Sequence, residues 1–548
     1  MHLTKDNVVV GDEIEFGIEE SLGHVQKLLL EMHGDKVIQI DAESGETLTA
    51  IEALNKSIKL AKKLVELGVK KGDAVTVNSE NRIEYVMVPL ACFYIGAIFA
   101  PLNPDYTSGE LNHVVNLSKP KVAFCSSSTL KLMIKLKQQH AFMEHLILFG
   151  KKPSNNLPMY EDIIRGVTKD TCIDDFEPVD LDAKEHVATI LCSSGTTGMP
   201  KGVMATHRNM TAFMEIARTR VQELYEFEEN MSAQGIVTFG LTPFFHSMGF
   251  MTMYMNCLGG NLIIVIKKFK AKLFLEAIEK FKVTTLIVPP PVLLVLTKHP
   301  LAKNYDFSSL RDIRSGAAPM GKEMEVELRE KFKLRHVSQS YGMTETTLGV
   351  LVSSLSECRV GSVGKIVPGN MCKVVDEAGN ALGPNQEGEL CFQGPLIMKG
   401  YVNDPTSTAN TIDKDGWLHT GDIAYFDKDF YFFIVDRIKE LIKYKAFQVA
   451  PAELEALLLQ HPQVSDVGVI GLPDPDAGEL PLAFVVRKDG AKVTEKELQD
   501  YVAGKVSRQK RLRGGVIFLE EIPKNPSGKI LRRVLKQRAI ATASRSKL

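Results

Sequence analysis

The sequence predicts an α/β fold in which mostly parallel sheets are covered by helices. A helical pattern at 53–67 is followed by β-rich runs at 74–78, 98–101 and 122–125. Strands that alternate with helix-length segments are typical of parallel sheets flanked by helices. The chain has 548 residues, of which 44% are hydrophobic and 24% charged. This length is enough for about three units, at roughly 100 to 200 residues per domain.

The same alternation continues through the middle of the chain and then changes. Further β-rich runs are expected at 235–242, 261–266 and 284–289, separated by helix-length segments. Between 361 and 394, short strands are divided by Gly, Pro and Asn turns. That pattern predicts a small β-barrel-like region. We therefore expect doubly wound sheets followed by this β-rich region.

A compact α+β module is predicted after Arg437. The patterns predict a helix at 452–460, strands at 464–472 and 480–488, and a helix at 494–505. Thr494 and Glu497 fit a capping box at the start of the last helix. We place the boundary between an N-terminal domain, 1–438, and a C-terminal domain, 439–548.

The charge balance excludes some kinds of partner. With 66 basic and 67 acidic residues the net charge is −1, so no nucleic-acid partner is expected. The apolar segments 85–102 and 262–266 are too short or too broken by small and polar residues to cross a membrane. The eight cysteines show no C-x-x-C spacing and no histidine at metal-ligand intervals. They predict reduced thiols in an intracellular protein.

One loop has the composition of a polyphosphate site. The run SSGTTGMPKG, Ser193 to Gly202, follows the apolar stretch 187–191 and combines glycines, hydroxyls, a proline and a lysine. Glycine lets the backbone approach a ligand, while hydroxyls, N–H groups and the ammonium interact with phosphate. The pattern G-x-x-x-x-G-K-[ST] does not fit, because Lys201 is followed by Gly202. A polar surface turn is the alternative.

Five further segments occur downstream. They are GAAP at 316–319, YGMTET at 341–346, GWLHTGD at 416–422, VDRIKELIKY at 435–444 and PKNPSGKILRR at 523–533. Together with the loop, in this order, they resemble the adenylate-forming superfamily of acyl-CoA synthetases, peptide-synthetase adenylation domains and beetle luciferases. The similarity is greatest to insect luciferases and their fatty acyl-CoA synthetase relatives.

The resemblance implies an architecture and a reaction. It implies a large N-terminal part and a small mobile C-terminal lid, with the hinge near Lys439. A carboxylic acid would attack the α-phosphorus of ATP to give acyl-AMP and pyrophosphate, and CoA would then accept the acyl group. Positioning and neutralisation of charge dominate such a step, so lysines, hydroxyls, N–H groups and Mg²⁺ are the expected tools.

The resemblance also assigns nucleotide-binding residues. Thr196, Thr197 and Lys201 would be the chief phosphate partners in a loop whose residues are Ser193, Ser194, Gly195, Thr196, Thr197, Gly198 and Lys201. The adenine would lie against Gly316, Ala317, Ala318 and Pro319, with Tyr341 stacking on its other side. A tight turn explains GAAP equally well when it is taken alone.

The remaining nucleotide contacts come from two more motifs. Gly342 and Met343 would lie beside the nucleotide, Thr344 would touch the α-phosphate, and Glu345 would hold Mg²⁺, a hard cation that takes oxygen ligands. Asp422 resembles the ribose-binding aspartate, and Arg437 its companion near the ribose and phosphate. Taken without the motifs, Glu345 would be interpreted as a solvated surface acid. Asp422 and Arg437 would each be interpreted as one partner of a surface salt bridge.

Three residues are assigned to catalysis. Lys529 would be brought by the closing lid to the reacting phosphate and carboxylate oxygens, where an ammonium stabilises the developing charge. His246, in PFFHSMGF, would lie beside the carboxylate, and Phe245 would gate the pantetheine tunnel. After adenylation the lid would rotate and present Lys443 for thioester formation.

The expected acyl pocket is apolar and is formed by Phe213, Met248, Thr252 and Leu348. The chain resembles beetle luciferases, but their pocket has arginine, phenylalanine and serine at the positions of Phe213, Met248 and Leu348. The replacements favour a flexible alkyl chain. We therefore expect an ATP- and Mg²⁺-dependent medium- to long-chain fatty acyl-CoA synthetase. The alternatives are a luciferase, adenylation for transfer to a carrier protein, and an inactive binding protein.

Two further features of the sequence concern CoA and location. Ala446 stands where relatives keep a glycine near the pantetheine path, which bears on the rate of thioester formation rather than on adenylation. The tripeptide Ser546, Lys547 and Leu548 is the address read by the peroxisomal import receptor, so a peroxisomal location is expected. A chance tripeptide on a frayed tail is the alternative.

Overall fold

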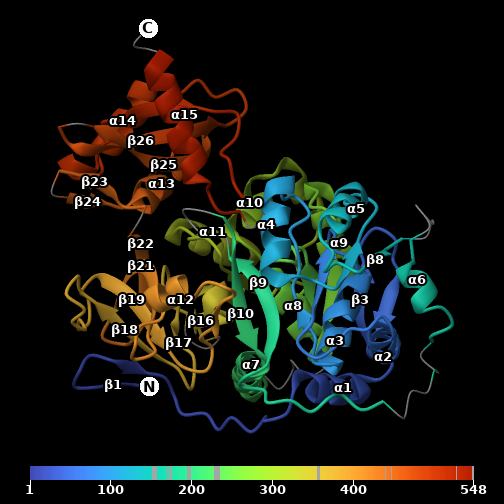
Figure 1. The fold of residues 1–548 in the computed structure, drawn as a ribbon. Helices are drawn as coiled ribbons and strands as arrows, with labels where there is room; N and C mark the ends of the chain where they lie inside the picture. The colour runs from blue at the N-terminus through green and yellow to red at the C-terminus, as the bar shows by residue number, and fades with distance from the viewer. Residues whose placement is uncertain are drawn as a thin grey trace.

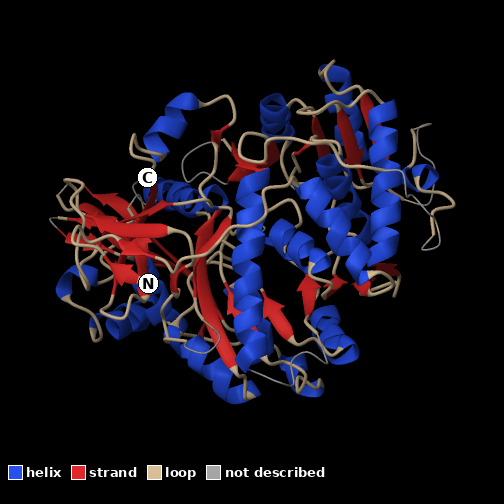
Figure 2. Ribbon diagram, turned by 90° about the horizontal axis from the view of Figure 1, so that it is seen from below, coloured by secondary structure: helices blue, strands red, loops and turns tan. Residues whose placement is uncertain are grey.

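In the computed structural model, five sheets and their helices form an α/β body, a β-rich region and a C-terminal α+β module (Figure 1). The structure describes residues 1–548 except 151–156, 169–170, 172–175, 194–198, 228–234, 355–357, 439, 446, 475, 526–527 and 546–548. In Figure 2 strands gather at one side of the molecule, and helices surround the strands of the other side.

The largest sheet has seven strands in the order β20-β10-β9-β6-β5-β7-β8. Its members are β5 (Ala74–Asn78), β6 (Ile98–Phe99), β7 (Val122–Cys125), β8 (His145–Leu148), β9 (Val187–Ser193), β10 (Lys201–Thr206) and β20 (Gly400–Tyr401). β5 and β7 match the predicted ranges. β6 is shorter than predicted and ends before Pro101, which has no N–H to donate. β9 and β10 pair antiparallel, so the predicted phosphate loop joins two neighbouring strands.

Two further sheets complete the body, in the orders β11-β12-β3-β4 and β13-β14-β15-β16-β17. Their strands are β3 (Val37–Asp41), β4 (Thr47–Thr49), β11 (Val237–Gly240), β12 (Leu262–Val265), β13 (Thr285–Ile287), β14 (Asp312–Ser315), β15 (His336–Met343), β16 (Leu348–Val352) and β17 (Lys365–Ile366). β13, β14 and β15 are parallel, so their carboxyl ends share one edge of the sheet. In open α/β sheets that edge is the usual place for a ligand.

Helices cover these sheets and bury the main apolar core. They are α1 (Leu22–His33), α2 (Ala50–Glu66), α3 (Met87–Tyr94), α4 (Ser108–Ser118), α5 (Leu130–Gln139), α6 (Tyr160–Ile163), α7 (His207–Phe227), α8 (Ser247–Leu258), α9 (Ala271–Phe281), α10 (Pro290–Lys298) and α11 (Lys322–Phe332). α2 starts at a capping box formed by Thr49 and Glu52. The core packs aromatic rings edge to face, for example Tyr85 against Phe244, which adds to the stabilisation from burial. None of the described helices has the length and apolar character needed to cross a membrane.

The β-rich region is an antiparallel sheet in the order β1-β2-β18-β19-β21-β22. It contains β1 (His2–Leu3), β2 (Val9–Val10), β18 (Met371–Val375), β19 (Gly388–Gln393), β21 (Leu418–Phe426) and β22 (Phe432–Arg437), with α12 (Pro405–Thr411) nearby. The short strands predicted within 361–394 are present. The N-terminal strands join them, a pairing that the local sequence pattern does not predict because it is long-range.

The C-terminal module has its own sheet and its own core. Its elements are β23 (Ile442–Tyr444), β24 (Phe447–Val449), α13 (Pro451–Leu459), β25 (Val464–Asp474), β26 (Gly478–Arg487), α14 (Glu495–Ala503), β27 (Gly515–Phe518) and α15 (Arg532–Arg545). These elements match the predicted α+β order. The Thr494–Glu497 capping box is confirmed, because Thr494 Oγ1 accepts from Glu497 N and Glu497 Oε2 accepts from Thr494 N.

Candidate active site

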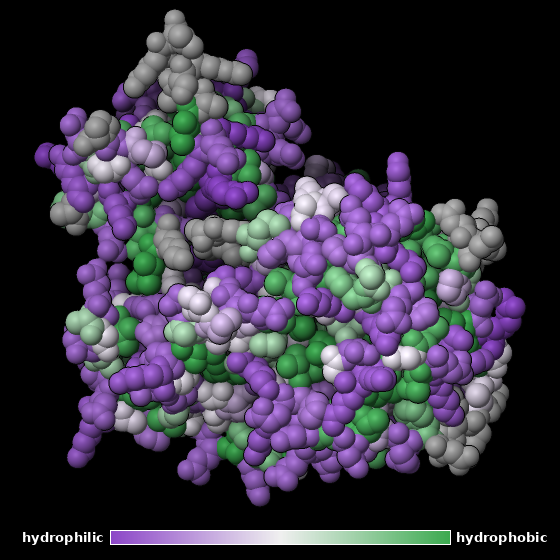
Figure 3. All heavy atoms as spheres, in the orientation of Figure 1, coloured by the Kyte–Doolittle hydropathy of each residue, from purple (hydrophilic) through white to green (hydrophobic). Residues whose placement is uncertain are grey.

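A cleft of about 3610 Å³ lies between the body and the C-terminal module, and Figure 3 shows the hollow between the two. The cleft brings together most of the residues that the sequence analysis singled out. Those that line it are Ser193, Lys201, Phe213, His246, Met248, Thr252, Gly316, Ala317, Ala318, Pro319, Tyr341, Gly342, Met343, Thr344, Glu345, Leu348, Asp422, Arg437 and Lys529.

Two described residues of the expected site, Phe245 and Lys443, are absent from this lining. Phe245 is half-buried but is not among the described residues that line the cleft, and Lys443 is exposed on β23. The backbone N–H of Lys443 donates to Glu479 Oε2 at 3.0 Å. Ser194, Gly195, Thr196, Thr197, Gly198, Lys439, Ala446, Ser546, Lys547 and Leu548 fall outside the described residues. Their assigned roles remain predictions.

Asp422 is the centre of one corner of the cleft. It lies opposite Arg437 in the β21–β22 register, and Arg437 Nε lies 3.3 Å from Asp422 Oδ1. The Tyr341 hydroxyl donates to Asp422 Oδ2 at 2.5 Å, while the Tyr341 ring stacks on Phe392. Burial raises the pKa of Asp422, and the Arg437 guanidinium opposes that rise. A carboxylate has about four acceptor positions, so the corner can still accept hydroxyl donors from a sugar.

The GAAP segment forms a turn at the carboxyl end of β14. Ala317 has φ +67°, a left-handed conformation that is unusual for a residue with a side chain. Strained backbone of this kind clusters at ligand sites. The turn therefore lies where the parallel strands predict a ligand, on the same wall as Tyr341.

Glu345 is held by a tyrosine that the sequence analysis missed. Glu345 is buried in the short 3-10 helix η3 (Thr344–Thr346), and its Oε1 accepts a 2.9 Å hydrogen bond from the Tyr401 hydroxyl. Lys201 Nζ lies 4.7 Å from the centre of the Tyr401 ring and donates to Ser407 Oγ at 2.8 Å. Tyr401 thus connects the lysine of the phosphate loop with the acid assigned to the metal. No motif in the sequence indicates it, because it comes from a separate short strand.

His246 is a neutral group in the cleft. It is the N-cap of α8, and its Nδ1 accepts from Met248 N at 3.4 Å, which leaves the proton on Nε2. Burial, together with the nearby Lys529 ammonium, lowers the pKa of His246 to about 4. His246 can therefore act as a hydrogen-bond donor at neutral pH without carrying charge.

Lys529 reaches the same corner from the C-terminal module. Burial and the neighbouring Arg437 guanidinium lower the pKa of Lys529 to about 8, against the opposing effect of Glu440 and Asp422. A tight backbone loop fixes the position, because Asn525 Oδ1 accepts from Lys529 N at 2.8 Å and Lys529 O accepts from Asn525 N at 2.9 Å. The ammonium is thus near the groups expected to surround a nucleotide.

Contacts across the cleft hold the C-terminal module in this position. Asp436 Oδ2, at the end of β22 in the body, accepts from Ala452 N of the C-terminal module at 3.1 Å. A Cβ added to Gly528 would lie 3.3 Å from Pro291 Cγ in the body. The module therefore lies directly against the body beside Lys529.

Part of the cleft lining is apolar. Helix α8 contributes Met248, Met251, Thr252 and Met255 to the lining, and Phe213 comes from α7. Methionine side chains are flexible and fill irregular space. Such a lining suits an elongated apolar group.

Comparisons with known proteins agree with this geometry. A profile described as AMP-binding enzyme matches residues 29–402, and one described as AMP-binding enzyme C-terminal domain matches 453–529. The chain is 39% identical to luciferin 4-monooxygenase of Nipponoluciola cruciata, with 97% of each chain covered. It is 38% identical to 4-coumarate–CoA ligase CCL1 of Humulus lupulus, over 92% of this chain and 91% of that one.

Solved structures share the fold. ATP-bound MatB from Rhodopseudomonas palustris is 27% identical, with a TM-score of 0.83 over 94% of this chain and 98% of that one. The anthranilate CoA ligase AuaEII, in complex with anthranoyl-AMP, has a TM-score of 0.85 at 22% identity and covers 97% of this chain and 99% of its own. Both consist of a large N-terminal domain and a small C-terminal domain, as here.

Proposed function

Because the chain belongs to the AMP-binding family of adenylate-forming enzymes, whose reaction is ATP-dependent adenylation of an acid, we propose that it is a medium- to long-chain fatty acyl-CoA synthetase. The observation that carries the proposal is the convergence of Lys529, His246 and the Asp422 corner on one cleft whose lining also includes apolar side chains of α7 and α8. Polar groups for a nucleotide and an apolar space for an alkyl chain then share one site.

In the first half-reaction a carboxylate oxygen of the acid forms a bond to the α-phosphorus of ATP, and the bond to the pyrophosphate oxygen breaks. Acyl-AMP and pyrophosphate result. Lys529 would neutralise the charge that develops on the α-phosphate oxygens, an effect that is strong where water is excluded. His246 would donate Nε2–H to the substrate carboxylate, and its neutrality fits that role.

Mg²⁺ fits the residues at η3. Glu345 offers a buried carboxylate with one oxygen fixed by Tyr401, and Thr344 supplies a hydroxyl beside it. Oxygen donors of this kind suit a hard divalent cation. When bound, Mg²⁺ would neutralise phosphate charge and orient the departing pyrophosphate.

In the second half-reaction the CoA thiolate would attack the acyl carbonyl carbon and release AMP. Lys443 is exposed and is not among the described residues that line the cleft. The proposal therefore includes a rotation of the C-terminal module, which would withdraw Lys529 and bring the β23 face to the cleft.

A luciferase is the second candidate, favoured by the identity to luciferin 4-monooxygenases. The apolar character of Phe213, Met248 and Leu348 supports the alkyl chain instead. The test is a panel of saturated fatty acids, coumarate and luciferin, each assayed for pyrophosphate, AMP, thioester and light. We expect thioester formation to be fastest with a medium or long alkyl acid. Light with luciferin and no thioester with any fatty acid would favour the luciferase, and no acid-dependent pyrophosphate would reject both.

A further inference from the structure

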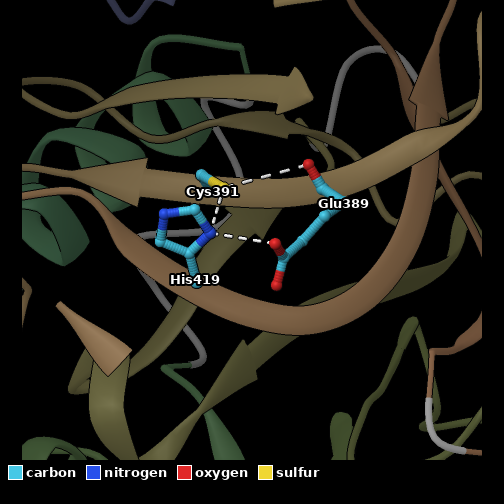
Figure 4. A group of neighbouring side chains, drawn as sticks. All are labelled: Glu389, Cys391 and His419. Atoms are coloured by element: carbon cyan, nitrogen blue, oxygen red, sulfur yellow. Dashed lines mark hydrogen bonds and ion pairs between the residues drawn. The ribbon is translucent and has the colours of Figure 1, made fainter. Parts of the chain in front are cut away.

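A second group of metal-ligating side chains lies behind the Asp422 corner. Glu389 and Cys391 extend from β19, and His419 extends from the neighbouring strand β21 (Figure 4). His419 Nδ1 lies 2.9 Å from Glu389 Oε2 and 3.4 Å from Cys391 Sγ. One ligand atom of each residue lies within 4.8 Å of the other two. Spacing along the sequence does not indicate this group, because the pairing of β19 with β21 brings together residues 28 apart.

We propose that Glu389, Cys391 and His419 form a binding site for one Zn²⁺ ion, with water as the fourth ligand. A thiolate, an imidazole and a carboxylate are all ligands that Zn²⁺ accepts in tetrahedral sites, whereas Mg²⁺ prefers oxygen alone. This site is separate from the acid assigned to Mg²⁺, Glu345, and does not depend on the proposed reaction.

The spacing of the donor atoms fits such an ion. Tetrahedral bonds of about 2.3 Å to sulfur and about 2.0–2.2 Å to nitrogen and oxygen place the ligand atoms roughly 3.4–3.6 Å from one another. The Cys391–His419 separation already has this value, at 3.4 Å. The Glu389–His419 separation is that of a hydrogen bond, 2.9 Å, so it must widen by about half an ångström when the ion replaces the proton.

The two half-buried ligands, Glu389 and His419, are already oriented by outer partners. His419 Nε2 lies 3.5 Å from Asp413 Oδ2. Asp413 can therefore accept a hydrogen bond from the Nε2–H group while Nδ1 binds the ion. Glu389 Oε1 accepts from Gly421 N at 3.0 Å, which leaves Oε2 for the ion. Carboxylates behind a zinc-bound histidine are typical of zinc sites.

The ion has a path to the site, and its binding balances chemically. Glu389 and His419 line the cleft, while Cys391 is fully buried behind them. Binding would convert the Cys391 thiol to a Zn²⁺-bound thiolate and release its proton to the solvent, because the ligand is the thiolate. The proton displaced from His419 Nδ1 would be carried by Nε2 in the other tautomer of the neutral imidazole, beside Asp413. No oxidant or reductant is required.

The test uses the full chain after treatment with a chelator. We expect calorimetric titration with Zn²⁺ to show one site per chain with release of protons, and Co²⁺ to give a sulfur-to-cobalt charge-transfer band. C391S should abolish that band and weaken Zn²⁺ binding at least 100-fold, and H419A should weaken it similarly. D413N should weaken binding by about 10- to 100-fold, as loss of an outer partner does.

The matched control is C358S. Cys358 is half-buried and its thiol donates to Ser354 O, so its removal should leave the titration and the band unchanged. The wild-type Co²⁺ spectrum needs no variant, so the proposal stays testable even if a variant fails to fold. Absence of a sulfur-to-cobalt band in the wild type, or an unchanged band and affinity in C391S, would overturn it.

Discussion

The Tyr341 hydroxyl donates a 2.5 Å hydrogen bond to Asp422 Oδ2, and this bond joins residues 81 positions apart. It connects the end of β15 with β21, so the wall expected to face adenine is tied to the carboxylate expected to face ribose. The Tyr341 ring is held from behind by Phe392, 6.0 Å away between ring centres. The bond therefore fixes the carboxylate within a packed wall.

Tyr341→Phe should raise the KM for ATP more than it lowers kcat. A hydrogen bond to a charged group contributes roughly 1.5–3 kcal/mol, so the KM for ATP should rise about 10-fold or more, while kcat changes little. Steady-state kinetics at saturating acid measure both values. The control is Tyr305→Phe, which removes a similar hydroxyl–carboxylate bond, to Glu276, outside the cleft lining. An unchanged KM in Tyr341→Phe would contradict the role of Asp422.

Lys529→Ala should lower the rate of adenylation roughly 100- to 1,000-fold, because loss of one preorganised electrostatic partner has effects of that size. Binding of ATP should change much less, since other groups hold the nucleotide. Single-turnover formation of acyl-AMP and equilibrium binding of ATP separate the two effects. Lys524→Ala is the matched control, because Lys524 Nζ is paired with Asp466 at 2.7 Å. Near-normal adenylation by Lys529→Ala would count against its catalytic role.

The rate of adenylation should depend on pH through the protonation state of Lys529. The pKa of Lys529 is lowered to about 8, so the ammonium is present below that pH and is lost above it. In the free enzyme kcat/KM should therefore fall as the pH rises through about 8. His246, with its pKa lowered to about 4, stays neutral above pH 5 and should add no acidic limb there. Lys529→Arg, which stays charged, should lose the alkaline limb, and persistence of that limb would assign it to another group.

Much of the architecture could be predicted from local patterns. The runs at 74–78 and 122–125 are strands at those positions, and the capping box at Thr494 starts the predicted helix. These features depend on residues close together in the chain, which is why the pattern is sufficient. The N-terminal strands β1 and β2 were not predicted, because two residues each give no periodicity and their pairing with β18 is long-range.

In the site, too, the features that the motifs predict differ from those that depend on long-range strand pairing. The motifs predicted that Tyr341, Asp422 and Lys529 would share a cleft, and they do. The motifs did not indicate Tyr401, which holds Glu345, or the meeting of Cys391 with His419. Both depend on which strands lie side by side, and spacing along the chain does not contain that information.

Gly342→Ala should be strongly destabilising, because an added Cβ would lie 1.6 Å from the backbone oxygen of Leu348. A backbone atom cannot move aside as a side chain can, so we expect a loss of about 3 kcal/mol in the free energy of unfolding. Gly349 is its partner across the β15–β16 pair, and a Cβ there would meet only Val352 Cγ2, at 3.4 Å. Gly349→Ala is thus a control that should be tolerated. Denaturant unfolding of the two variants gives the comparison, and equal stabilities would contradict the close approach.

Leu348→Ser should shift substrate preference from alkyl acids toward luciferin. Leu348 lines the cleft and packs against the main core, so a serine there removes apolar contact from a bound chain. A loss of about 1.5 kcal/mol in the free energy of apolar contact with the alkyl chain lowers kcat/KM for laurate roughly 10-fold. Leu348 has φ +92°, a strain that serine and methionine would both share, so Leu348→Met is a control that keeps the apolar surface. Competition between laurate and luciferin for adenylation measures the ratio directly. If Leu348→Ser and Leu348→Met leave the same ratio, the polarity at this position does not select the acid, and the apolar-pocket argument for a fatty acid fails.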